Sequence, residues 1–265
     1  MITASVVTYN TDIEELNNCL TDIEASMIER VYVIDNSSRD YIAQTCKGFD
    51  KAEYIPSENR GFGAGHNIAI RETMAIGSNY HIVMNSDISF DSSAIEVLYN
   101  YMNSNPDVAQ AQPKIVYPNG EIQYSCRLLP TPANLIFRRF LPKSWGKKMN
   151  DRYLLKNRDL SKEMNIPYHQ GSFIFFRTEC FKKVGLFDER FFMYPEDIDI
   201  TRRMHKYYRT MYVPYTTIIH NHRAESYKNR KMLKIHIINM IKYFNKWGWV
   251  FDKERREFNK LGMRN

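Results

Sequence analysis

The sequence predicts an α/β fold in which a mostly parallel central sheet carries helices on both faces, followed by a C-terminal helical extension. Short apolar runs typical of buried strands alternate with amphipathic helical patterns through about the first hundred residues. This alternation is typical of parallel strands joined by right-handed crossovers. Polar clusters also follow one strand after another, as expected at the ligand-binding edge of an open sheet.

The first half of the chain contains four predicted strands and three predicted helices. Apolar runs bounded by polar residues predict strands at 2–8, 31–34, 52–55 and 80–84. Apolar residues spaced by three and four predict a helix over 12–28. Three glycines predict a loop at 61–65, which leads into a helix over 67–76. A further helix is expected to begin near Ser92.

The strict alternation stops in the second half. Further strands are expected at 108–116, 121–124, 172–176, 211–213 and 217–219. A helix is expected at 196–207, and another at 231–247, which has apolar residues on one side and many lysines on the other. The basic, proline-bearing segment 127–166 has weak periodicity and is interpreted as an insertion.

The composition is that of a globular protein with a substantial core. No apolar run approaches the ~20 residues needed to cross a bilayer, and the N-terminus lacks the pattern of a signal peptide. The four cysteines lie far apart with no CxxC pair, which predicts free thiols in a reducing compartment and argues against structural zinc. We therefore expect a cytoplasmic protein.

The net charge of +7 is concentrated in two segments. Residues 221–265 carry a net charge of +8, and residues 127–158 carry another +8. Such segments suit nucleic acid, anionic lipid or a phosphorylated substrate, and they are also compatible with a merely solvated surface. Signatures of RNA or DNA binding are absent, so no nucleic-acid partner is expected.

Four polar clusters are expected to meet at the carboxyl ends of the strands. They consist of Thr8, Tyr9 and Asn10; Asp35 and Asn36; Asn59, Gly61, Gly63 and Asn67; and Asn85, Ser86 and Asp87. Together they predict a binding crevice. The glycine segment differs from a dinucleotide fingerprint in its spacing and follows the third strand, and no phosphate-binding GxxxxGK[ST] motif is present. A dehydrogenase or a P-loop enzyme is therefore excluded.

Two groups of carboxylates suggest the chemistry. Asp87 follows a strand, where it suits Mg²⁺ or Mn²⁺ that neutralises a diphosphate leaving group; capping of the next helix is better explained by Asp91. Glu196, Asp197 and Asp199 begin a helix, where acids are favourable to the helix dipole and where one of them suits a base that deprotonates a hydroxyl. Asp199 is expected to pair with Arg203, which leaves Asp197 as the freer carboxylate.

Six motifs resemble those of glycosyltransferase family 2, in particular its bacterial rhamnosyltransferase-like branch. In order, they are Val6-Val7-Thr8-Tyr9-Asn10, Val33-Ile34-Asp35-Asn36-Ser37-Ser38, Asn59-Arg60-Gly61-Phe62-Gly63, Asn85-Ser86-Asp87, Gly171-Ser172-Phe173 and Phe192-Met193-Tyr194-Pro195-Glu196-Asp197-Ile198-Asp199. The resemblance covers roughly residues 1–226. It implies a GT-A fold, a nucleotide-sugar donor, a divalent cation and inversion at the anomeric carbon.

The resemblance also implies roles for particular residues. Asp35 matches the position that contacts the base or ribose, and Thr8 and Asn10 line the same pocket. Asp87 matches the last acid of the family's metal motif, with Asn85 where the first acid is often found. His220 resembles a histidine that completes the metal site. Asp197 matches the catalytic base, with Glu196 left open as the alternative, while Gly171, Ser172, Asp199 and Arg203 are expected to contact the acceptor or support the site.

The sequence therefore predicts an inverting, metal-dependent glycosyltransferase. The expected donor is dTDP-rhamnose or a UDP-hexose, and the expected acceptor is a lipid-linked precursor of a surface polysaccharide. The transferase domain is expected over 1–226, with a nucleotide-binding half (1–104) and an acceptor half (105–226), and a basic helical extension over 227–265. Two alternatives are a nucleotidyltransferase and a non-catalytic carbohydrate-binding protein.

Peripheral contact with an anionic membrane is a further hypothesis from the sequence. The helix 231–247 carries an apolar stripe beside lysines, and Trp247 and Trp249 lie at its end. A second basic and aromatic surface is expected from Phe137, Arg138, Arg139, Phe140, Lys143, Trp145, Lys147 and Lys148. The alternative is that the apolar stripe packs on the catalytic domain and the lysines are merely solvated.

Overall fold

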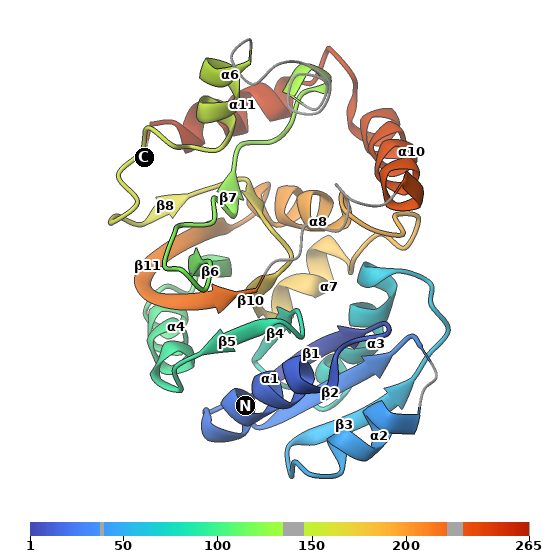
Figure 1. The fold of residues 1–265 in the computed structure, drawn as a ribbon. Coiled ribbons are helices and arrows are strands. Elements are labelled where there is room, and N and C mark those ends of the chain that lie inside the picture. Colours follow the sequence, from blue (N-terminus) through green and yellow to red (C-terminus); the bar gives the residue numbers. More distant parts are fainter. Residues whose placement is uncertain (38–39, 135–145, 222–229, 265) are drawn as a thin grey trace.

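A nine-stranded sheet forms the centre of the molecule (Figure 1). This computed structural model describes residues 1–37, 40–134, 146–221 and 230–264. The N-terminal part of the sheet contains four parallel strands in the order β3-β2-β1-β4, which are β1 (Ile2–Thr8), β2 (Arg30–Asp35), β3 (Ala52–Pro56) and β4 (Tyr80–Met84). Strand order reverses at β1, so the carboxyl ends of β1, β2 and β4 open onto a topological switch point.

The C-terminal part of the sheet is mixed. Strand β10 (Phe173–Arg177) runs antiparallel between β4 and β6 (Val108–Val116), and β11 (Arg209–His220) runs parallel to β6. Two short strands, β5 (Ile88–Phe90) and β8 (Met164–Asn165), pair antiparallel with β11. The predicted α/β class with a mostly parallel sheet is therefore confirmed. The reversed direction of β10 brings its first residues to the ends of β1 and β4.

Helices cover both faces of the sheet. The described helices are α1 (Ile13–Ala25), α2 (Asp40–Cys46), α3 (Phe62–Ala75), α4 (Ser93–Ser104), α6 (Lys147–Tyr153), α7 (Phe181–Val184), α8 (Glu196–His205), α10 (Arg230–Trp247) and α11 (Lys253–Gly262), with a 3₁₀ turn at Thr178–Cys180. Side chains of α1, α2 and α4 share one apolar cluster with the sheet. Those of α3, α7 and α8 share another cluster with β4 and β10, which places the start of α8 on the same side as α3.

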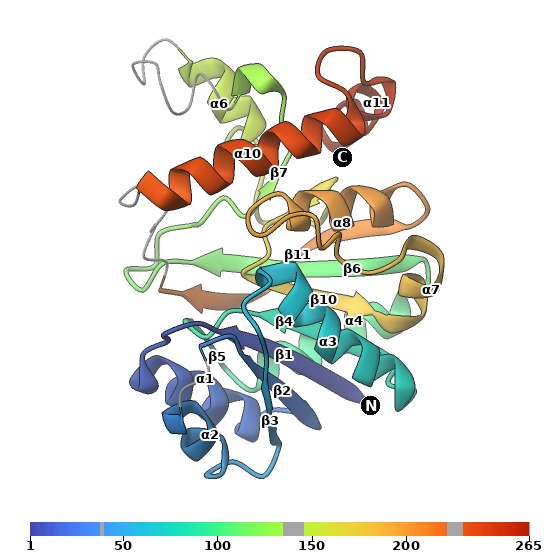
Figure 2. The same ribbon diagram turned by 90° about the vertical axis from the view of Figure 1, so that its right-hand side faces the viewer.

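A third apolar cluster joins segments that are far apart in the sequence. It contains Leu129, Tyr153 and Ile166 from the basic segment, Ile198 from α8, and side chains of α10 such as Tyr243. A two-stranded sheet, β7 (Cys126–Arg127) with β9 (Tyr168–His169), lies beside it. The described part of the basic segment and helix α10 therefore pack against the end of the molecule that carries α8 (Figure 2).

Three predicted elements differ from the structure. The predicted loop 61–65 belongs mostly to α3, because Gly65 lets the first turns approach β1: an added Cβ would lie 2.8 Å from a Val7 methyl group. The predicted strand 121–124 makes only a single bridge, between Val116 and Ile122. The two strands predicted at 211–213 and 217–219 are one strand, β11, whose register shifts between Val213 and Thr217. Pro214 lies in that interval and cannot donate to the ladder.

Candidate active site

The ends of β1 and β2 enclose a buried carboxylate. Asp35 is fully buried, and its Oδ1 accepts hydrogen bonds from Thr8 Oγ1 at 3.1 Å and the Ser37 N–H at 2.9 Å. The Tyr54 hydroxyl donates to Oδ2 at 3.2 Å. The structure therefore brings Thr8 and Asp35 together, as predicted, and holds the carboxylate in one orientation.

Three other predicted residues surround this carboxylate. Tyr9 is 60% exposed, and Asn10 has a φ of 52°, a left-handed conformation that asparagine tolerates and that turns the chain toward α1. Asn36 is buried, and its Oδ1 accepts no hydrogen bond from the described residues. A buried carbonyl oxygen without a donor is costly, so Asn36 is well suited to contact a bound molecule.

The glycine segment docks the start of α3 against the chain that leads to α8. Gly61 has a φ of 108°, and an added Cβ would lie 2.2 Å from the Phe192 carbonyl oxygen. The same carbonyl accepts the Phe62 N–H at 3.0 Å. An added Cβ at Gly63 would lie 3.4 Å from Cγ of Glu196. Asn59 accepts the Gly61 N–H at 3.3 Å. These contacts show that Gly61 and Gly63 allow the start of α3 to pack closely against the segment that leads into α8.

Asn67 has a role inside the protein. Its side chain accepts the Phe187 N–H at 2.9 Å and donates to the Phe187 carbonyl at 2.9 Å. It also donates to Glu189 at 3.0 Å. The amide is thus engaged in joining α3 to the segment before α8, which argues against the predicted contact with the donor.

Asp87 and His220 lie side by side at the ends of neighbouring strands. His220 Nε2 is 3.3 Å from Asp87 Oδ1 and 3.4 Å from Asn85 Nδ2. The backbone fixes this arrangement, because β5 pairs with β11 and the Asn221 N–H donates to the Asp87 carbonyl at 3.0 Å. Ser86 lies between Asn85 and Asp87 and is half-buried. The two predicted metal ligands therefore converge.

Gln123 orients the His220 ring and was not identified from the sequence. Its amide nitrogen donates to the His220 carbonyl at 2.7 Å, so its Oε1 is the acceptor that lies 2.8 Å from His220 Nδ1. This arrangement assigns the proton to Nδ1 and directs Nε2 toward Asp87. Metal-binding histidines commonly have such a partner on the second nitrogen. Asp87 Oδ1 is buried and accepts no hydrogen bond from the described residues, so the pair fits a divalent cation.

Asp197 is held at the start of α8 by donors from three directions. Its Oδ2 accepts the Gly171 N–H at 2.9 Å, and the Tyr168 hydroxyl lies 3.4 Å away. Its Oδ1 accepts the Ile198 N–H at 2.7 Å. Burial raises the pKa of Asp197 and that of its neighbour Glu196, and the charge of Asp197 raises the pKa of Glu196 further. The pair therefore retains a proton at a higher pH than ordinary carboxylates.

Arg127 lies near Asp197 and, like Gln123, was not identified from the sequence as a site residue. Its guanidinium lies 5.6 Å from the centre of the Tyr168 ring, and it donates to the Tyr124 carbonyl at 2.7 Å and to Gln170 at 3.0 Å. Its positive charge lowers the pKa of Asp197 and opposes the effect of burial. Nothing in the sequence distinguished Arg127 from the other basic residues of its segment. Its position near Asp197 depends on the pairing of β7 with β9.

Asp199 and Arg203 support the architecture of the site. Their predicted ion pair is confirmed, with Arg203 Nε 2.8 Å from Asp199 Oδ2. Asp199 is fully buried, and its Oδ1 accepts the Trp247 indole N–H at 2.7 Å and lies 2.6 Å from Lys246 Nζ. Arg203 also donates to the Leu186 carbonyl at 2.6 Å. Both side chains thus join α8 to its neighbours, and Asp199 is fully engaged by cations and donors.

Gly171 and Ser172 connect the two groups of acidic residues. Gly171 donates to Asp197, and the Ser172 carbonyl accepts the Asn85 N–H at 3.0 Å. An added Cβ at Gly171 would lie 3.3 Å from Asp197 Cβ. The Ser172 hydroxyl is buried without a hydrogen-bond partner among the described residues. One short segment therefore contacts both Asp197 and the strand end that leads to Asp87.

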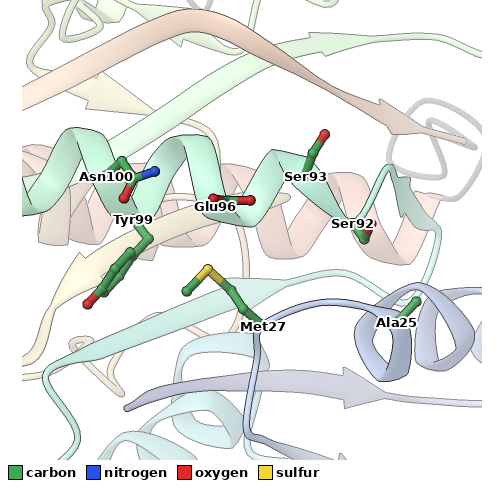
Figure 3. A pocket seen from close by; sticks show the side chains of 7 residues that line it. All are labelled: Ala25, Met27, Ser92, Ser93, Glu96, Tyr99 and Asn100. Carbon is green, nitrogen blue, oxygen red and sulfur yellow. The ribbon is translucent and has the colours of Figure 1, made fainter.

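A separate surface pocket lies between the end of α1 and the start of α4 (Figure 3). Its lining residues are Ala25, Met27, Ser92, Ser93, Glu96, Tyr99 and Asn100. None of the predicted site residues lines it, so the pocket takes no part in the site.

Comparisons with known proteins agree on one family. The model of the family described as "Glycosyl transferase family 2" matches residues 3–185. The chain is 27% identical over 207 residues to the N-acetylglucosaminyl-diphospho-decaprenol L-rhamnosyltransferase of Mycobacterium tuberculosis, covering 74% of this chain and 67% of the relative. It is 25% identical over 200 residues to the Escherichia coli rhamnosyltransferase WbbL, covering 72% of each. The low-salt glycan biosynthesis hexosyltransferase Agl10 of Haloferax volcanii is 28% identical over 202 residues, with 75% of this chain and 59% of the relative covered.

Solved structures show the same fold. The structure of GalNAc-T7 with UDP, GalNAc and Mn²⁺ matches 97% of this chain with a TM-score of 0.68 and 13% identity. The mannosyltransferase PcManGT of Pyrobaculum calidifontis, in complex with GDP-Man and Mn²⁺, matches 92% with a TM-score of 0.61 and 16% identity. The chain spans 49% and 63% of these two proteins. The expected GT-A fold is therefore confirmed.

Proposed function

The chain belongs to glycosyltransferase family 2, and we propose that it is an inverting, metal-dependent enzyme that moves a sugar from a nucleoside diphosphate to a lipid-linked saccharide. The observation that carries this proposal is that two consecutive residues, Gly171 and Ser172, contact both groups of acidic residues. One binds Asp197 and the other binds the strand end that leads to Asp87. A cation site and a candidate base are thus held by one segment of backbone.

The nucleoside is proposed to bind at the ends of β1 and β2. Asp35 is buried and oriented by Thr8, Ser37 and Tyr54, so its carboxylate is suited to accept hydrogen bonds from a base or ribose. Tyr9 is exposed directly after Thr8, and Asn36, whose Oδ1 accepts no hydrogen bond from the described residues, directly follows Asp35. We assign the donor to residues 1–104, the acceptor to residues 105–226 and a helical extension to residues 227–265, of which helix α10 packs against the acceptor half.

The diphosphate is proposed to share a divalent cation with Asp87 and His220. Within the described ranges, no three His, Cys, Asp or Glu side chains gather as a metal site. Two protein ligands are consistent with a cation whose other ligands come from the diphosphate and water, as is usual for Mg²⁺. Such a cation would supply charge neutralisation for the leaving nucleoside diphosphate. Asn85 and Gln123 hold the His220 ring in place.

Asp197 is proposed as the base. It accepts the proton of the acceptor hydroxyl as that oxygen forms a bond to the anomeric carbon, while the bond to the diphosphate breaks on the opposite face. The N–H of Gly171 and the hydroxyl of Tyr168 orient the carboxylate, and burial raises its pKa toward the range in which a base works best. Glu196, whose Oε2 is buried without a hydrogen-bond partner among the described residues, is the alternative base.

The relatives support the choice of substrates. Two are named rhamnosyltransferases, which favours dTDP-rhamnose as donor, and one of these acts on an N-acetylglucosaminyl-diphospho-decaprenol. A lipid-linked saccharide is therefore the proposed acceptor. The hexosyltransferase from Haloferax volcanii supports a hexose as the second candidate sugar, for which we propose a UDP-hexose as the donor. Neither a nucleotidyltransferase nor a non-catalytic binding protein agrees with the family to which the chain belongs.

A donor screen tests the proposal. Purified protein is incubated with dTDP-, UDP- or GDP-sugars, with Mn²⁺, Mg²⁺ or a chelator, and with a sugar-diphospho-lipid acceptor, and released nucleotide is measured. We expect release from dTDP-rhamnose that requires both acceptor and cation and gives a product of inverted configuration. Equal release in the presence of the chelator would contradict metal dependence, and transfer with retained configuration would contradict the mechanism.

A further inference from the structure

Helix α10 has two different apolar faces. On the inner face Met240, Tyr243 and Phe244 are buried against the third apolar cluster. On the adjoining side of the helix Ile237, Ile238 and Ile241 are 40%, 42% and 43% exposed. The packing of the inner face therefore explains only part of the apolar pattern of this helix, and three isoleucines are left in contact with solvent.

The exposed face continues past the end of the helix. Trp249 is 43% exposed, and its indole N–H donates to Asn245, which lies one turn after Ile241. Val250 is 63% exposed and Phe251 is 91% exposed. Together with the three isoleucines, these residues form what we call the outer face, which comprises Ile237, Ile238, Ile241, Trp249, Val250 and Phe251. Helix α10 lies across one end of the molecule, away from the sheet (Figure 2).

The charged residues of helix α10 have a single sign. Helix α10 contains five basic residues and no acid. Two of them, Lys234 and Lys242, are each one turn from Ile238, although Lys242 Nζ donates to the Arg190 carbonyl at 2.9 Å. Arg230 and Lys231 lie at the start of the helix, where both are exposed. Lys246 is turned inward, toward Asp188 and Asp199. The cations beside the outer face are therefore not matched by acids of the same helix.

We propose that the outer face rests on the surface of an anionic lipid membrane. Isoleucine, tryptophan and phenylalanine side chains enter the boundary between headgroups and acyl chains, while lysines beside them meet anionic headgroups. A second copy of the chain is disfavoured as the occupant, because two such helices would bring like charges together. No helix in the described ranges is long and apolar enough to cross a membrane, so the contact we propose is interfacial.

The outer face is coupled to the helix that carries Asp197. Asp199 of α8 binds both Lys246 and Trp247 at the end of α10. Arg202 of α8 binds Asp252 through two hydrogen bonds of 2.7 Å, and Asp252 caps α11 directly after Phe251. Membrane contact would thus hold the catalytic crevice at a set position relative to the lipid surface. The suggestion that this membrane contact places the site near a lipid-linked acceptor rests on the proposed function.

The second surface predicted from the sequence is only partly described. Phe137, Arg138, Arg139, Phe140, Lys143 and Trp145 lie outside the described residues. Lys147 and Lys148 are exposed on α6. The inference is therefore carried by α10 and the turn after it.

Vesicle co-sedimentation tests the inference and needs neither donor nor acceptor. The full chain is mixed with vesicles of phosphatidylglycerol and phosphatidylcholine, or of phosphatidylcholine alone. We expect binding to the anionic vesicles that is at least tenfold stronger than to the neutral ones and that weakens as salt is raised. The double variant I238D/I241D is expected to lose at least tenfold in binding.

A matched control is available on another part of the surface. Ile13 is 45% exposed on α1, so I13D changes an equally exposed isoleucine far from α10 and is expected to bind vesicles as the unmodified chain does. Circular dichroism confirms that each variant is folded. Negligible binding of the unmodified chain to both vesicle types, or equal binding by I238D/I241D, would overturn the inference. A dimer in solution that I238D/I241D dissociates would also overturn it and assign the face to a second copy. Released nucleotide, measured with a detergent-dispersed acceptor, reports the proposed function separately.

Discussion

His220 Nε2 lies 3.3 Å from Asp87 Oδ1, although the two residues belong to opposite halves of the chain. The antiparallel pairing of β5 with β11 places them side by side, and Gln123 orients the ring from behind. A carboxylate oxygen and an imidazole nitrogen thus converge where the diphosphate of the donor is proposed to bind.

Replacement of these residues should weaken metal-dependent binding of the donor. Asp87→Ala is expected to abolish the gain in nucleoside diphosphate affinity that Mn²⁺ provides, and His220→Ala should have a smaller effect of the same kind. Gln123→Leu should lower metal affinity by roughly 10–100-fold, because it removes the partner of the ring. Calorimetry with and without Mn²⁺ is the measurement. Asp91→Asn, which changes an exposed carboxylate on the other side of β5, is the control. Unchanged metal dependence in Asp87→Ala would refute the assignment.

Asp197→Asn should reduce turnover by ~10²–10⁴-fold while donor affinity stays within a few fold, because a general base contributes to the chemical step and not to donor binding. The amide keeps the size of the carboxylate and an acceptor for the Gly171 N–H. Steady-state kinetics and calorimetry separate the two effects. Turnover within threefold of the unmodified enzyme would shift the role to Glu196, since Asp199 is engaged by Arg203, Lys246 and Trp247.

The activity should depend on pH in a range where ordinary carboxylates do not titrate. The base must be ionised, and burial raises its pKa, so kcat/KM is expected to fall as the pH drops through that raised value. A carboxyl with a pKa of about 4 would give a flat profile between pH 5 and 8. A flat profile over this range in the unmodified enzyme would contradict the assignment.

Arg127 should act through the pKa of Asp197. Its positive charge lowers that pKa, so Arg127→Met is expected to shift the profile of kcat/KM toward higher pH, with activity recovering as the pH is raised. Arg127→Lys keeps the charge and should restore the original profile at least in part. A uniform loss of activity at every pH, equal in both variants, would assign Arg127 a purely structural role.

Gly61→Ala should destabilise the fold more than Gly77→Ala does. Both glycines have a positive φ, 108° and 70°, at which alanine is strained. At Gly77 an added Cβ meets nothing within 4 Å, whereas at Gly61 it would lie 2.2 Å from the Phe192 carbonyl oxygen. Gly61→Ala is thus expected to cost over ~3 kcal/mol in the free energy of unfolding, a loss typical of a backbone clash. Thermal unfolding provides the measurement, and equal losses in the two variants would contradict this account.

Several features of this protein follow from the sequence by itself. The first four strands and α1 were predicted close to their observed bounds, because hydrophobic periodicity is a local property of the chain. The polar residues at strand ends and the acids at the start of α8 were also predictable, since these positions follow from where an element begins or ends. The motifs that resemble glycosyltransferase family 2 occur in these same places, which is why the family was predicted correctly.

Only the tertiary structure determined which partners each of these side chains contacts. Asn67 and Asp199 are as polar in sequence as Asn36 and Asp197, yet the first two are engaged by Phe187 and by Lys246 and Trp247. Gln123 and Arg127 gave no local signal, because contacts between distant segments bring them to His220 and Asp197. A side chain's partners depend on which segments pack together, and that packing is set by the burial of apolar faces across the whole chain.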